Sequence, residues 1–193
     1  MNYNQIEEFK LDYSNLVTIH LSFNSLKHLN RNLFSDFTSL TAIYLGYNKL
    51  SQLEGGIFDG LPNLAIIDLC WNQLTHIEKN TFKELRNLKK LFLHGNKLDE
   101  LNKELFTDLT CLNALSLYRN ELKQIDKNAF KGLTNLVRIE MHKNSFKCSK
   151  IELELEKSVK FVSFKNRFSN DIHSVMLPVS IYFINLDELN NYV

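Results

Sequence analysis

Cysteine and histidine are the residues whose side chains could support nucleophilic catalysis or bind a metal ion in this chain. A Cys70 nucleophile would need a base, and His94 is the one candidate, but no third group is placed to orient the pair. His94 and His142 are two periods of the repeat described below apart, about 10 Å, which is too far for one metal ion without further ligands. His28 and His76 have the same separation. There is no glycine-rich phosphate loop and no strong paired-carboxylate motif, so we expect no catalytic residue, no cofactor and no metal, and the chain is not predicted to be an enzyme.

The overall composition excludes several other classes of protein. The 193 residues include 23 basic and 22 acidic side chains, a net charge of +1, so no nucleic-acid partner is expected. The best candidate for a membrane span, residues 172–184, is shorter than the roughly 18 apolar residues required and contains His173 and Pro178. The residues after Met1 have neither the basic start nor the apolar run of a signal peptide. Three cysteines form no disulfide framework, and we expect three free thiols.

An internal repeat of 24 residues positions most side chains in this chain. Each repeat, called a rung below, opens with a leucine and carries an asparagine eight residues later. The opening leucines are Leu16, Leu40, Leu64, Leu88, Leu112 and Leu136. The asparagines are Asn24, Asn48, Asn72, Asn96, Asn120 and Asn144. A phenylalanine column follows at Phe34, Phe58, Phe82, Phe106 and Phe130.

Each column of the repeat has a physical reason. The first six residues of a rung alternate apolar and polar side chains, which indicates a half-buried strand, and neighbouring strands would pair in parallel about 4.8 Å apart. The asparagine amide can donate and accept hydrogen bonds where the chain turns inward, so we expect a structural asparagine ladder. The phenylalanines fall on the opposite side, where successive rings can stack. Gly60 and Gly132 permit tight turns there.

The rungs follow the pattern L-x-x-L-x-L-x-x-N-x-L-x-x-L-x-x-x-x-F-x-x-L-x-x, which resembles the 24-residue "typical" class of leucine-rich repeats. That class occurs in Toll-like receptor ectodomains, small matrix proteoglycans and arthropod secreted immune repeat proteins. The resemblance implies an α/β solenoid, a horseshoe with a parallel concave sheet and a mostly irregular convex side. We divide the chain into a partial N-terminal repeat or cap (1–15), six leucine-rich repeats (16–147) and a C-terminal capping region and tail (148–193).

The C-terminal end departs from the family pattern. Cys148 matches the first cysteine of the family's C-terminal cap, but the position of the second is Lys150, so the usual disulfide is not expected. Residues 149–157 are predicted to form a short helix with Ser149 as its N-cap, while alternation of apolar and acidic residues leaves a strand as the alternative. Residues 159–164 are predicted to form a strand that continues the ladder.

The outward positions of the strands form the predicted ligand-binding surface, because their side chains are not needed for the core. Tyr44, Phe92 and Tyr118 lie on the open face of the strands, and aromatic residues are enriched among binding hot spots. The aromatic residues just before the ladder either bind ligand or cover the edge of the ladder. The candidate ligand-binding residues are His20, Tyr44, Tyr47, Asp68, Trp71, Phe92, His94, Tyr118, Arg119, Glu140 and His142.

Basic residues gather late on this face, where they either steer a partner with an acidic patch or form a solvated flank. They are Lys89, Lys90, Arg119, Arg138, Lys143 and Lys147.

The resemblance implies a protein-recognition module with a protein ligand on its concave face. We expect an extracellular or cell-surface setting, with an innate-immune or adhesion role. The absence of a signal peptide and the unpaired cysteines favour the alternative of a cytosolic adaptor or regulator. A matrix glycan-binding role is a third class, which heparin retention that collapses in moderate salt would support.

Overall fold

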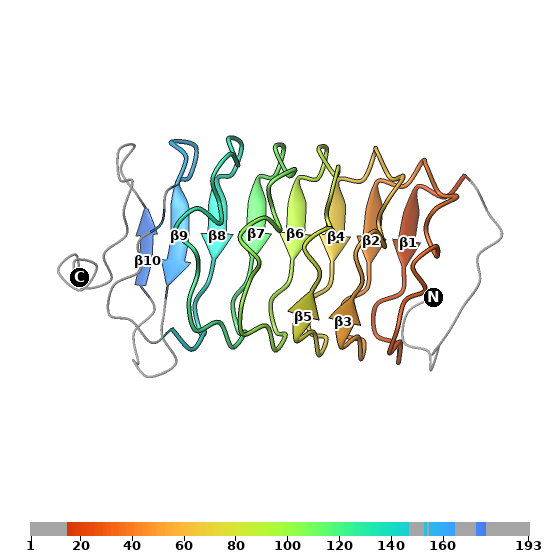
Figure 1. The fold of residues 1–193 in the computed structure, drawn as a ribbon, viewed down its shortest axis with the longest axis horizontal. Helices are drawn as coiled ribbons and strands as arrows, with labels where there is room; N and C mark the ends of the chain where they lie inside the picture. The colour runs from red at the N-terminus through yellow and green to blue at the C-terminus, as the bar shows by residue number, and fades with distance from the viewer. Residues whose placement is uncertain (1–14, 147–152, 154, 165–172, 177–193) are drawn as a thin grey trace.

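The computed structural model describes residues 15–146, 153, 155–164 and 173–176. Within them the chain coils into a solenoid whose six rungs contribute one strand each to a parallel sheet, as predicted, and two later strands extend this sheet to eight strands. Figure 1 shows these strands side by side in chain order. They are β1 (Thr18–His20), β2 (Ala42–Tyr44), β4 (Ile66–Asp68), β6 (Lys90–Phe92), β7 (Ala114–Ser116), β8 (Arg138–Glu140), β9 (Phe161–Phe164) and β10 (His173–Met176).

From β1 to β8, residues that pair in the sheet are 24 positions apart in the sequence, which is the period of the repeat. Ile19 pairs with Ile43, and Ile43 with Ile67, and the parallel pairing continues in the same register to β8. Hydrogen bonds between rungs continue past the strand ends, as from the Leu21 amide to the Tyr44 carbonyl at 2.8 Å. Side chains at equivalent positions therefore form straight columns across the concave face.

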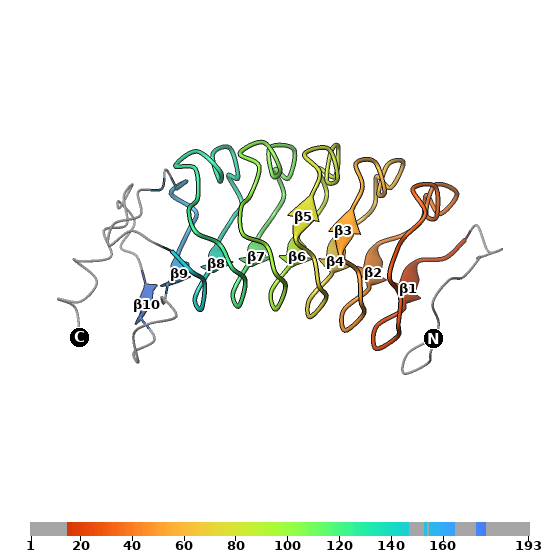
Figure 2. The same ribbon diagram turned by 60° about the horizontal axis from the view of Figure 1, so that its bottom comes forward.

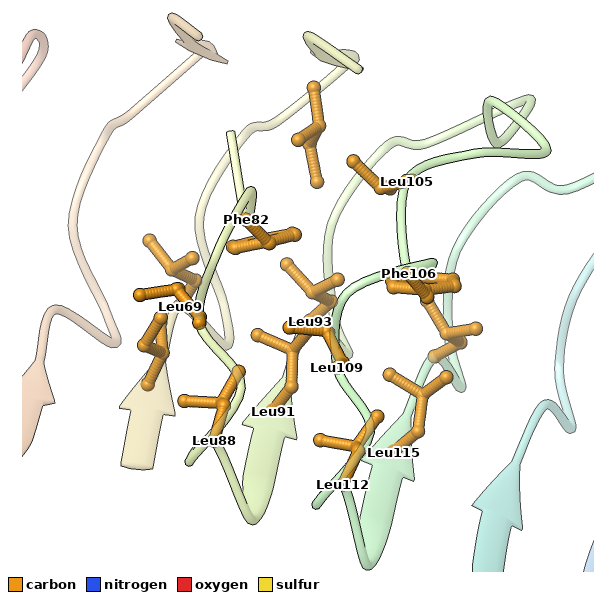
Figure 3. Close-up of a cluster of buried hydrophobic side chains, with 14 of the residues drawn as sticks. Leu69, Phe82, Leu88, Leu91, Leu93, Leu105, Phe106, Leu109, Leu112 and Leu115 are labelled. Carbon is orange, nitrogen blue, oxygen red and sulfur yellow. The ribbon is translucent and has the colours of Figure 1, made fainter. Parts of the chain in front are cut away.

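Leucine and phenylalanine fill the inside of the coil. Figure 3 shows Leu91, Leu93 and Leu115 directed into the coil with Phe82 and Phe106, and all five are at most 1% exposed. On the convex side the phenylalanine rings stack, with centroids 5.9 Å apart for Phe34 and Phe58 and 6.1 Å for Phe106 and Phe130. The core is thus one continuous column that gives each rung a rigid base.

The convex side is irregular, as expected. Figure 2 shows the rungs as an arc, with the large sheet along one side and the loops on the other. The described loops consist mainly of consecutive turns rather than helices, and two of them carry the short parallel pair β3 (Gln52–Leu53) and β5 (His76–Ile77). Gly60 and Gly132 have φ of 77° and 83°, which fits the tight turns predicted for them. In the described part of the chain, no helix is long and apolar enough to cross a membrane.

The C-terminal end of the solenoid differs from the prediction in one respect. The prediction of a helix over 149–157 is wrong for its described residues, because Leu153 and 155–157 have no helical structure. Leu153 and Leu155 are both buried, at 0% and 4% exposed, so alternate side chains join the core as in the extended alternative. Covering the open end of the sixth rung with two leucines explains why an extended path is preferred.

The strand predicted over 159–164 is present as β9, which pairs in parallel with β8. β10 then pairs antiparallel with β9, an arrangement that the sequence analysis did not predict. Residues 1–14 of the predicted partial N-terminal repeat or cap, Cys148, Ser149 and the tail after Met176 lie outside the described residues.

Candidate binding surface

The asparagine ladder lies directly beneath the candidate binding surface. The Asn72 side-chain amide donates to the Leu45 carbonyl of the preceding rung at 2.9 Å and to the Leu69 carbonyl of its own rung at 3.2 Å. Its side-chain oxygen accepts from the Leu50 amide at 3.0 Å. The same three bonds occur at Asn48, Asn96, Asn120 and Asn144. Each of these amides therefore fixes the corner after the strand to the rung before it.

The residue just before each asparagine forms a corner column with left-handed backbone. Its φ angle is 59° at Phe23, 56° at Tyr47 and 52° at Trp71, with 54° at Arg119 and 58° at Lys143. Gly95 holds the fourth place in the column with φ of 70°. Residues other than glycine adopt this conformation at a cost of about 1–2 kcal/mol. The column thus places large side chains where glycine would be less strained.

Three of these corner residues form an aromatic stack on the first three rungs, called the aromatic column below. The rings of Phe23 and Tyr47 are parallel at 4.3 Å, and Tyr47 and Trp71 stack at 5.9 Å. Phe23 is 38% and Tyr47 44% exposed. Both faces of the Tyr47 ring are covered by neighbouring rings, so its exposed surface is the ring edge and the hydroxyl.

Trp71 connects the aromatic column to the basic end of the face. A Cβ atom on Gly95 would lie 2.7 Å from the Trp71 ring, so the indole occupies the space that the glycine leaves open. The Arg119 guanidinium carbon lies 5.5 Å from the centre of the same ring, within cation–π range. The indole of Trp71, on rung three, therefore contacts rung four at Gly95 and rung five at Arg119.

A second aromatic group crosses rungs four to six. His94 stacks on Tyr118 at 4.3 Å, and Tyr118 stacks on His142 at 4.6 Å, with Phe92 edge-on to His94. The His142 Nδ1 lies 2.9 Å from the Ser163 hydroxyl. The His94 Nδ1 is buried, with no hydrogen-bond partner among the described residues.

Burial dominates the electrostatics of this second group. It lowers the pKa of both His94 and His142 below the usual histidine range, against the opposing effect of the Glu140 carboxylate. Burial also raises the pKa of the Tyr118 hydroxyl. The unpartnered Nδ1 of His94 agrees with this direction, because a proton there would have no acceptor. Burial therefore favours the neutral form of both imidazoles.

The remaining predicted site residues are accounted for by local contacts. His20 and Tyr44, from β1 and β2, stack at 4.5 Å. Asp68 accepts a hydrogen bond from the Cys70 amide at 2.9 Å. Glu140 binds Arg138 at 2.6 Å, and the Ser116 hydroxyl donates to it at 3.0 Å.

The arrangement around Cys70 is unsuited to nucleophilic catalysis. Burial raises the pKa of the Cys70 thiol far above its ordinary value, and the Asp68 carboxylate raises it further. A reactive thiolate requires the opposite, an electropositive environment that lowers the pKa. Cys70 and Cys111 are free thiols. Among the residues with described positions, no group of three or more His, Cys, Asp or Glu side chains could hold a metal ion.

Sequence reasoning missed two features of this surface. Ser163 reaches His142 because β9 joins the sheet 23 residues after its partners in β8, one short of the repeat period. The left-handed corner was also missed, although Gly95 in a column of aromatic and basic residues was a signal for it.

The comparison with known proteins identifies the repeat. The family model described as "Leucine rich repeat" matches residues 14–74, 40–98, 62–122 and 86–146, which together cover more than half of the chain. No match was found among curated proteins.

Proposed function

The chain belongs to the leucine-rich repeat family, and we propose that it is a recognition module whose protein ligand binds the concave sheet. Leucine-rich repeats are protein-interaction modules, and the solenoid is typical of a binding scaffold rather than an enzyme. Tyr44, Phe92 and Tyr118, together with the aromatic column, would form the central contacts. The repeats keep these side chains on a rigid base, so little ordering is required when a ligand binds.

The aromatic column is the observation that carries this proposal. Its three residues occupy left-handed positions at which glycine is less strained, and Gly95 shows that the fold accepts glycine there. The left-handed corner recurs on all six rungs, so the backbone belongs to the fold, and the large aromatic rings are what distinguish its first three positions. A covering role for the ladder does not require rings that are 38% and 44% exposed, whereas a binding role does.

The setting that we propose is the extracellular space or the cell surface, with an innate-immune or adhesion role. Its support is the resemblance of the phenylalanine-bearing 24-residue repeat to that of secreted and receptor proteins. The measurement is the distribution of a C-terminally tagged full-length gene product between medium, cell surface and cytosol of its source cells. Confinement to the cytosol would refute this setting and favour the alternative of a cytosolic adaptor or regulator.

The binding proposal is tested with two matched double variants. Tyr44→Ala with Phe92→Ala alters the concave face, and Lys79→Ala with Lys127→Ala alters exposed convex loops. A ligand recovered from tissue extract with the wild-type protein is titrated against each by calorimetry. The concave variant should weaken binding by about 2 kcal/mol or more and change the free energy of unfolding by less than about 1 kcal/mol.

The convex variant should bind as the wild type does. The reverse result, with convex substitutions weakening binding and concave ones leaving it intact, would refute the concave site.

A further inference from the structure

The concave face is divided into two chemically different halves. At strand and corner positions the first three rungs, residues 17–23, 41–47 and 65–71, carry no lysine or arginine and one carboxylate, Asp68. The equivalent positions of the last three rungs, 89–95, 113–119 and 137–143, carry five basic residues and one carboxylate. The boundary lies between rungs three and four, where Arg119 reaches back over Trp71.

The cations of the second half are available to a ligand. Lys90 and Arg119 are exposed and Lys143 is half-buried, and in the described part of the chain no carboxylate forms a salt bridge with any of them. Glu140, the one carboxylate of this half, is already engaged by Arg138 and Ser116. An anionic ligand would therefore meet positive charge that the protein itself leaves uncompensated.

The first half offers apolar edges instead of positive charge. The aromatic column presents ring edges and the Tyr47 hydroxyl, because its rings stack on one another with interplanar angles of 8° and 20°. The covered faces of Tyr47 and Trp71 cannot accept stacked nucleobases, and a polyanion would find no cations over these three rungs. Apolar side chains can pack against such edges and exclude water from them.

We propose that the ligand is a protein segment with an apolar part, seated on rungs one to three, and an acidic part, seated on rungs four to six. The inference rests on the proposed function and names the chemical class of its partner. Charge complementarity fixes the direction of the segment along the solenoid. Six strands at about 4.8 Å spacing span about 24 Å, the length of about seven extended residues.

The test is selection from a phage library of random peptides about 12 residues long, which is enough to cross the face. Selection uses the whole chain, and affinity is measured from the fluorescence of Trp71, the single tryptophan of the chain, which lies at the boundary. Enriched peptides should combine aromatic or aliphatic residues in one half with Asp and Glu in the other. Reversing the order of the two halves should weaken a selected peptide about tenfold.

Matched charge reversals test the basic half independently of folding. Lys90→Glu with Lys143→Glu should weaken the selected peptides by at least about tenfold. Repeated selection on this variant should enrich peptides with Lys and Arg in place of Asp and Glu. Lys79→Glu with Lys127→Glu makes the same change of net charge on the convex loops. This variant should neither weaken the selected peptides nor change which peptides are enriched.

The remaining outcomes would overturn either the two-part ligand or the concave binding site. Peptides that bind the concave face without an acidic part, or no concave-dependent enrichment, would overturn the two-part ligand while leaving concave binding of a folded protein open. Peptides sensitive only to the convex variant would overturn the proposed function. A heparin dodecasaccharide that binds more tightly than any peptide and ignores Phe23→Ser with Tyr47→Ser would assign the basic half to a glycan.

Discussion

The ladder asparagines from Asn48 to Asn144 each satisfy backbone groups of two rungs at once, because one side-chain amide both donates to carbonyls and accepts from a backbone N–H. We expect Asn72→Ala to lower the free energy of unfolding by about 1–3 kcal/mol, because the buried Leu50 amide loses its acceptor and the Leu45, Leu69 and Cys70 carbonyls each lose one donor. Urea titration measures the change.

Asn63→Ala is the matched control. Asn63 also donates across rungs, to the Thr38 carbonyl at 3.0 Å, but it is exposed, so water replaces the lost bond. Its loss should change stability by less than about 0.5 kcal/mol. If Asn72→Ala and Asn63→Ala lowered the free energy of unfolding equally, the ladder asparagines would have no special role in stability.

The stacked histidines should make stability depend on pH. The pKa of His94 and His142 is lowered in the folded protein, mainly by burial, with Glu140 and Asp68 opposing and Arg119 and Lys143 adding to it. As pH falls, these two histidines bind protons in the unfolded chain before they do so in the folded protein. Their contribution to the free energy of unfolding is therefore complete above the unfolded pKa of about 6.5 and is lost as pH falls toward the lower folded pKa.

The free energy of unfolding should accordingly fall as pH is lowered from 7.5 through the unfolded histidine pKa of about 6.5, and His94→Gln with His142→Gln should flatten this dependence. Urea titrations at a series of pH values measure it. His28→Gln, at an exposed position on rung one, should leave the wild-type dependence unchanged. A double variant as steep as wild type would place the proton uptake elsewhere.

At the scale of the element, the left-handed corner controls how the aromatic side chains are presented. Gly95→Ala should displace Trp71, because the new Cβ would lie 2.7 Å from its ring, and should cost more than the about 1–2 kcal/mol of left-handed strain alone. A shift in tryptophan fluorescence and a lower urea midpoint are the expected signals.

Gly132→Ala separates the two contributions. Gly132 has a similar φ of 83°, but nothing lies within 4 Å of the added Cβ, so this variant reports strain without collision. It should leave the fluorescence unchanged. A Gly95→Ala spectrum identical to wild type would contradict the placement of Trp71 against rung four.

The repeated elements were predictable and the non-repeated ones were not. The strands, the buried columns and the phenylalanine stack follow from the spacing of Leu, Asn and Phe alone. Contacts that differ from rung to rung, such as Arg119 on Trp71 or Ser163 on His142, depend on rotamers and on the 23-residue step into β9. The path through Leu153 and Leu155 was set by the open core of rung six, a tertiary demand that outweighed local helix propensity.

The molecule as a whole is a sum of similar units, each of which contacts only its neighbours. Stability in such a solenoid is approximately the sum of rung energies and interface energies, so one complete period can be removed without changing the columns. Deleting residues 112–135 joins Cys111 to Leu136 and brings Leu136 into the place of Leu112. Asn144 then follows Asn96 in the ladder, and Gly95 still faces Trp71.

The deletion of one period should give a folded, cooperative protein with a lower melting temperature, because one interface between rungs is lost. Its circular dichroism per residue should match that of the full chain. Deleting residues 112–123, half a period, should give an unfolded or aggregating protein, because polar residues then enter the core columns. Calorimetry and size-exclusion chromatography distinguish these outcomes. If both deletions were equally tolerated, the 24-residue register could not be what determines the fold, and the straight columns of the concave face would need another cause.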